Sequence, residues 1–204
     1  DYKGAAGAYG SGSHYTGIPG VFGTTLTTSE LTDIIKTTVA PNGHGYELYG
    51  LSDTDIADLV EFIETRVIDT DLYIDAGAEF IGDAGQGQTN YSLGSCNFCH
   101  GDEGTALNFA TPDDPEWVGT IATVNPWELL HKIRVGNPGT SMPSWVGGGG
   151  SDQGAADIGA YSQLTQPALS LCTKLPRTTC AQSARASLMV KKPADPTKAK
   201  IKFK

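Results

Sequence analysis

A stretch near the middle of the chain, "SCNFCHGDEG", places Cys96, Cys99 and His100 within five positions. A CxxC pair can bind zinc, but zinc needs further ligands. The other two cysteines, Cys172 and Cys180, offer neither a second CxxC nor a His spacing typical of zinc modules. A redox-active dithiol would begin a helix within alternating strands and helices, a pattern that this chain does not show. Both chemistries therefore fit poorly.

Covalent attachment of haem c uses all three residues of this stretch. The thiols of Cys96 and Cys99 would add to the two vinyl groups, and His100 would ligate the iron. A second axial ligand should then lie later in the chain. Met142 in "NPGTSMPSW" is the better of the two methionines, because flanking prolines make a stiff loop that can present a thioether. His131 is the rival, although its helical spacing in "NPWELLHKIRVG" favours a helix surface or a contact at the haem edge.

Three motifs resemble a class I c-type cytochrome in their order: "CNFCHGDEG", "GNPGTSMPSW" and "DQGAADIGAYSQL". In that family a helix precedes CxxCH, a second helix leads to the methionine loop, and a last helix crosses the first. Residues 76–165 match this series, and the resemblance assigns the haem-binding roles to Cys96, Cys99, His100 and Met142. The family's proline that holds the proximal imidazole has no clear counterpart, so the hydrogen-bond partner of His100 stays open.

The first 75 residues resemble the same domain a second time. Residues 21–63 align with residues 117–164, because each segment has a Gly-Thr pair, an amphipathic helix, a Pro-Gly loop and a final helix. For the final helix of the first repeat, Ser52 and Asp55 predict a capped start. The spacing then predicts one apolar stripe, made of Ile56, Leu59, Val60 and Ile63.

Both iron-ligand positions of the first repeat carry other residues in this alignment. Lys3 stands at the position of His100, and Tyr46 stands at that of Met142. The first repeat is therefore predicted to bind no haem, and its core should be filled by aromatic side chains, because an empty cavity of that size is costly. The aromatic residues available for this are Tyr2, Tyr9, Tyr15, Phe22, Tyr46 and Tyr49.

Two alternatives stay open for residues 1–75. They could form an unrelated helical domain, since the matching segment is short. An upstream segment could also be missing, with His14 and His44 as ligands. Each of these histidines stands alone in a Gly-rich stretch, which favours a surface position.

Length and composition agree with an exported redox protein. The 204 residues with 39% hydrophobic content allow two modest cores, and no run approaches the roughly 18 apolar residues of a membrane span. The chain starts at Asp1 without a signal peptide, which we interpret as a mature form located in the periplasm or outside the cell. An oxidising compartment also permits a disulfide between Cys172 and Cys180, which flank a turn-like stretch, although two free thiols are the alternative.

Charge is distributed unevenly along the chain. Residues 1–173 hold 22 acidic and five basic residues, whereas residues 174–204 hold one acidic and nine basic residues. The alternation in "AKIKFK" predicts a strand with one charged face. The basic segment is either a solvated tail or a docking arm for an acidic surface, including that of another copy. The acidic body disfavours nucleic acid as a partner.

We therefore expect an all-α fold with long loops: a haem-free cytochrome c-like domain over residues 1–75, a monohaem domain over 76–165, and a basic extension with a disulfide over 166–204. A His100 and Met142 ligand pair leaves no open position for a substrate, so we expect a carrier of single electrons between redox partner proteins rather than an enzyme.

Two other functions stay open. The chain could be the cytochrome subunit or part of an oxidoreductase, for example one that oxidises sulfur compounds. It could also be a unit of an electron-conducting assembly, linked to other copies through the basic extension.

Overall fold

The computed structural model describes residues 1–12, 15, 17–37, 44–112, 114–165, 188–191 and 200–203. The chain divides into two compact units, Asp1–Pro167 and Ala168–Lys204. In the described residues of the first unit the regular elements are helices, with two isolated β-bridges at Gly4 with Pro19 and at Ile74 with Phe80. The predicted all-α class is confirmed.

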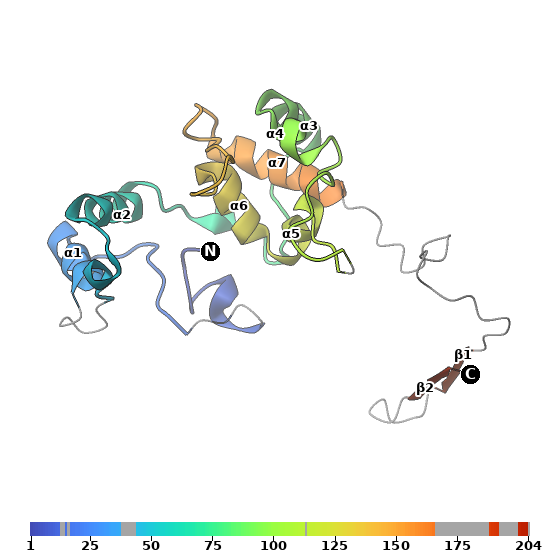
Figure 1. Cartoon of the computed structure of the whole chain (residues 1–204), viewed down its shortest axis with the longest axis horizontal. Coiled ribbons are helices and arrows are strands. Elements are labelled where there is room, and N and C mark those ends of the chain that lie inside the picture. Colours follow the sequence, from blue (N-terminus) through green and yellow to red (C-terminus); the bar gives the residue numbers. More distant parts are fainter. Residues whose placement is uncertain are drawn as a thin grey trace. The chain divides into compact units, whose positions relative to one another are not determined.

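Within its described residues the first unit has seven α-helices (Figure 1): α1 (Thr28–Lys36), α2 (Asp53–Thr65), α3 (Ala84–Leu93), α4 (Cys96–His100), α5 (Val118–Val124), α6 (Pro126–Val135) and α7 (Asp152–Leu164). Short 3-10 helices accompany them, among them η1 (Ala8–Gly10), η3 (Tyr46–Tyr49) and η4 (Thr70–Leu72).

Helices α1 and α2 pack together around a small aliphatic core made of Leu31, Ile35, Ile56 and Val60. Each begins with a capping box, in which the cap hydroxyl accepts a backbone N–H and a carboxylate three residues later accepts the cap's own N–H. The predicted start at Ser52 with Asp55 is confirmed. The predicted stripe is only partly right: Ile56 and Val60 are buried and Ile63 packs against them, whereas Leu59 is exposed.

The predicted aromatic core of the first segment is wrong. Tyr15, Phe22, Tyr46 and Tyr49 are all exposed, with Tyr49 at 77%. Four aliphatic side chains form the buried cluster between α1 and α2 in place of the aromatic ones. Tyr2 and Tyr9 are half-buried, and their rings lie against His131 and Trp127 of α6. The Tyr2 ring also lies 6.2 Å from that of Phe62 on α2, centroid to centroid. His44, once considered as a ligand, is exposed, and His14 lies outside the described residues.

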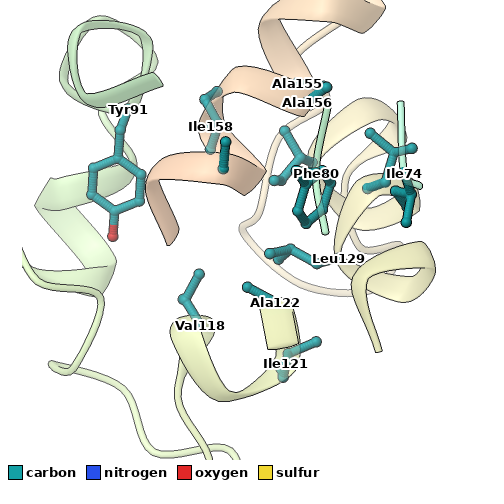
Figure 2. Close-up of a cluster of buried hydrophobic side chains, with 13 residues drawn as sticks. Ile74, Phe80, Tyr91, Val118, Ile121, Ala122, Leu129, Ala155, Ala156 and Ile158 are labelled. Atoms are coloured by element: carbon teal, nitrogen blue, oxygen red, sulfur yellow. The ribbon is translucent and has the colours of Figure 1, made fainter. Parts of the chain in front are cut away.

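The larger core lies where α3, α5 and α6 pack against α7 (Figure 2). Its buried side chains include Ile74, Phe80, Tyr91, Val118, Ala122, Leu129 and Ile158. Helix α7 can lie deep among its neighbours because Gly154, Ala155, Ala156, Gly159 and Ala160 are small and buried. Helix α3 meets α7 at Gly87, where an added Cβ would overlap the backbone carbonyl of Asp157. These small residues set how closely the two helices approach.

Helix α6 has a capping residue at each end. The Asn125 side chain accepts the N–H of Glu128, and Pro126 occupies the first helical position, where its missing N–H costs nothing. Gly136 ends the helix with a φ of 79°, a conformation that favours glycine. These boundaries place the following loop, residues 137–150, at the carboxyl end of α6.

In the second unit, strands β1 (Leu188–Lys191) and β2 (Lys200–Phe203) form an antiparallel pair with Leu188 opposite Phe203. The strand predicted from "AKIKFK" is thereby confirmed. The predicted disulfide between Cys172 and Cys180 falls outside the described residues. Across the described part of the chain, none of the helices has the length and apolar character needed to cross a membrane.

Candidate haem-binding site

The five-residue helix α4 carries both cysteines and the histidine of the motif. It is bounded by two residues in unusual backbone conformations, Ser95 with a φ of 58° and Gly101 with a φ of 75°. Left-handed residues turn the chain sharply, so α4 is set off from α3 before it and from the loop after it. The three side chains of the motif therefore project from a single short turn.

The two thiols of the motif differ in their surroundings. Cys96 is half-buried and packs against the larger core, and this burial raises the pKa of its thiol. Cys99 is exposed. Neither cysteine takes part in a disulfide, so both sulfurs are available for covalent attachment. The raised pKa keeps Cys96 a protonated thiol at neutral pH.

His100 is half-buried, and its ring lies beside that of Phe109, with centroids 5.9 Å apart. Burial lowers the pKa of the imidazole, which favours the neutral form that ligates metals. Its Nδ1 atom is buried, and no hydrogen-bond partner for it is found in the described ranges. Buried ring nitrogens are normally paired, so this imidazole is suited to a group that the protein alone does not supply.

Two tyrosines hold the chain directly after His100. The Tyr91 hydroxyl on α3 donates to the carbonyl of Gly101 at 2.9 Å, and the Tyr161 hydroxyl on α7 donates to the carbonyl of Asp102 at 2.8 Å. Their rings meet edge to face, with centroids 5.4 Å apart. The sequence analysis did not identify these two tyrosines as part of the site. Tyr91 in "NYSLGSC" lies on α3, directly before the motif, and Tyr161 in "GAYSQ" lies on the last helix, α7.

Several large apolar side chains within and close to the motif in sequence are exposed to solvent. Leu93 precedes it, Phe98 lies inside it at 91% exposure, and Leu107 and Phe109 follow it. Such side chains gain free energy when another apolar group covers them. A haem attached to Cys96 would bring a flat, apolar macrocycle that could cover some of these side chains.

The loop that carries Met142 folds back onto the end of α6. The N–H of Asn137 donates to the Met142 carbonyl at 3.3 Å, and a Cβ added at Gly136 would lie 2.7 Å from that carbonyl oxygen. The Met142 N–H donates to the Thr140 hydroxyl at 3.2 Å. Met142 is half-buried, and its backbone position is fixed by the last turn of α6.

Trp145 connects this loop to the neighbourhood of the motif. Its indole N–H donates to the Ser151 carbonyl at 3.0 Å, just before α7. Its ring also lies against Gly94 at the end of α3, where an added Cβ would be 3.1 Å from the indole. The loop with Met142 therefore contacts the residue that lies two positions before Cys96.

His131, the rival ligand, lies on α6 and is half-buried. The Tyr2 hydroxyl is 2.7 Å from its Nδ1 atom, and the Phe62 ring lies 6.0 Å from the imidazole, centroid to centroid. Burial and the nearby Arg134 guanidinium lower its pKa, so the imidazole is neutral at pH 7. One of its two nitrogens is thus engaged with the amino-terminal segment.

The residues present fit a covalently bound haem. The site combines two free thiols at the required spacing, a neutral imidazole whose buried Nδ1 lacks a partner in the described residues, and exposed apolar side chains around them. The thioether of Met142 comes from a loop that packs close to the same region.

A comparison with protein families agrees with this chemistry. Residues 82–161 match the family described as cytochrome C oxidase, cbb3-type, subunit III. This match supports a c-type cytochrome domain in that segment, and domains of this kind hold covalently bound haem c and transfer electrons between redox partners. No curated protein and no solved structure matches the chain significantly.

Proposed function

We propose that this protein carries single electrons through one haem c, which is attached at Cys96 and Cys99 and ligated by His100 and Met142. The observation that carries the proposal is the CxxCH helix inside the segment that matches a cytochrome family. This helix has two free thiols and a histidine whose buried Nδ1 has no hydrogen-bond partner among the described residues. When bound, haem c with a histidine and a methionine ligand supplies an iron that exchanges one electron without binding substrate.

The chain's own residues orient and shield this site in the proposal. Tyr91 and Tyr161 hold the backbone after His100, and α6 holds the loop of Met142. Residues 1–75 are proposed to carry no haem, since Lys3 and Tyr46 stand where the ligands would be. Lys3 instead pairs with Asp69 and Asp71 at 2.6 and 2.7 Å.

The proposed location is the periplasm or the outside of the cell. Cytochrome c domains are typically found there, because the haem is attached outside the cytoplasm in bacteria. The Cys172 and Cys180 pair is proposed to form a disulfide in the same oxidising environment.

The axial assignment makes a spectroscopic prediction. Ferric haem with a methionine ligand has a weak charge-transfer band in the red that haem with two histidine ligands lacks. We expect the wild type to show it and Met142→His to remove it and lower the reduction potential, because a thioether stabilises the reduced iron. His131→Ala is the matched control and should keep the band. If His131→Ala alone makes the iron high-spin, Met142 is not the ligand.

A second candidate function is that of the cytochrome part of a larger oxidoreductase. The description of the matching family favours it, because that family is a subunit of an oxidase. Oxidation of a sulfur compound is one reaction that such a complex could perform.

Turnover separates the two functions. Purified full-length protein should reduce its iron with thiosulfate or sulfite only when a separate enzyme is added, because the proposed ligand pair leaves no position for substrate. Catalytic turnover of either compound by the protein alone, measured with an artificial electron acceptor, would contradict the carrier.

A further inference from the structure

Arg134, near the end of α6, is only 3% exposed and joins three distant parts of the chain. Its Nε atom pairs with the Asp152 carboxylate at 2.6 Å. Its Nη1 atom donates to the Tyr2 hydroxyl at 3.1 Å, and its Nη2 atom donates to the Arg66 carbonyl at 3.0 Å. A buried guanidinium needs all of its partners, because an unsatisfied charged donor is costly.

The backbone of the same residue holds the loop of Met142. The Arg134 carbonyl accepts the Ser144 hydroxyl at 2.6 Å and the N–H of Val146 at 3.1 Å. Trp145, between these two, donates its N–H to the Ile133 carbonyl at 3.0 Å. The position of the loop therefore depends on where the last turn of α6 lies, and Arg134 fixes that turn from both its side chain and its backbone.

The amino-terminal segment contacts α6 at both of its ends. Near the carboxyl end, the Tyr2 hydroxyl accepts from Arg134 and shares a hydrogen bond of 2.7 Å with Nδ1 of His131. At the amino end, the Tyr9 hydroxyl donates to the Asn125 side chain at 3.0 Å. Tyr2 thus lies at the end next to the methionine loop, and Tyr9 lies at the opposite end.

We infer that Tyr2 and Arg134 are positioning residues for Met142, so that the amino-terminal segment braces the methionine loop of the cytochrome domain. Tyr2 and Arg66 lie outside the segment that matches the cytochrome family, whereas Arg134 and the loop lie inside it. The inference rests on the proposed function, because it takes Met142 as an axial ligand. The inference gives a role to Tyr2 and Arg134, neither of which would bind the haem.

Binding of imidazole to the oxidised protein measures how firmly the loop is held. Imidazole must displace Met142, so its apparent affinity scales with the fraction of molecules in which the loop is open. The full-length, haem-loaded Tyr2→Phe variant loses the hydroxyl between Arg134 and His131 and keeps the ring. We expect it to bind imidazole about tenfold more tightly than the wild type, a ratio that corresponds to about 1.4 kcal/mol. Arg134→Lys should have an effect at least as large, since it removes the fork that reaches Tyr2 and Arg66.

Tyr9→Phe is the matched control. It also removes a hydroxyl that links the amino-terminal segment to α6, but at the end away from the loop. It should bind imidazole within about twofold of the wild type, even if its thermal stability falls as much as that of Tyr2→Phe.

Three outcomes would overturn the inference in different ways. If Tyr2→Phe and the wild type bind imidazole equally well and both show the red charge-transfer band, Tyr2 does not position the loop, although Met142 can still be the ligand. Equal tightening in the Tyr2 and Tyr9 variants shows general loosening of the fold instead of positioning. A wild type without the band contradicts Met142 as ligand, and the inference falls together with that part of the proposed function.

Discussion

Replacing Cys96 and Cys99 together with alanine will abolish covalent haem. The wild type should keep one haem per chain after denaturation, because the thioether bonds survive unfolding, whereas the double variant should keep none. Intact mass spectrometry of the denatured protein, together with a pyridine haemochrome assay, gives the number of haems per chain.

Cys172 and Cys180 supply the control for this experiment. A double alanine variant at these positions also removes two thiols but should retain the haem, because neither residue belongs to a CxxCH motif. Two haems on the wild type would contradict a haem-free first segment, and haem retained by the Cys96 and Cys99 variant would contradict the attachment site.

The Gly87→Ala variant should lose about 3 kcal/mol of stability or more. The added Cβ would lie 2.5 Å from the carbonyl carbon of Asp157 and nearer still to its oxygen, and both atoms are backbone of α7. Backbone cannot turn aside as a flexible side chain does, so α3 and α7 have to separate, and overpacking of this kind is costly. For a protein of this size, the thermal midpoint should fall by roughly 6–12 °C.

Gly85→Ala on the same helix should behave in the opposite way. The only atom near its added Cβ is the Asp83 carboxylate oxygen at 3.2 Å, which belongs to a side chain. Alanine is favoured over glycine in a helix by about 0.5–1 kcal/mol, so this variant should match or exceed the wild-type midpoint. Equal losses in the two variants would show that the close approach of α3 and α7 does not limit stability.

The parts of the site that the sequence predicts are those that depend on neighbouring residues. Cys96, Cys99 and His100 were recognised because haem attachment uses residues that are adjacent in the sequence, and in the structure all three lie on one short helix. The start of α2 at Ser52 follows from a capping rule that acts over three residues. In each case a short stretch of sequence contains the whole physical cause.

The parts that sequence reasoning missed depend on contacts between distant segments. Nothing near Tyr91 or Tyr161 indicates that their hydroxyls will meet the carbonyls after His100. Arg134 reads as an ordinary basic residue in the last turn of a helix, yet it is buried, because Asp152 and the Arg66 carbonyl are brought to it by tertiary packing. The expected aromatic core failed for a different reason, because aliphatic side chains of the neighbouring helices α1 and α2 form the buried cluster there.

The hydrogen bonds of Tyr2 span 129 and 132 positions of the chain. Closing a loop of that length costs more chain entropy than joining α1 to α2, whose contacts are far more local, so the helix pair is free to form first. We therefore expect the contacts of Tyr2 to be among the last to form as the chain folds.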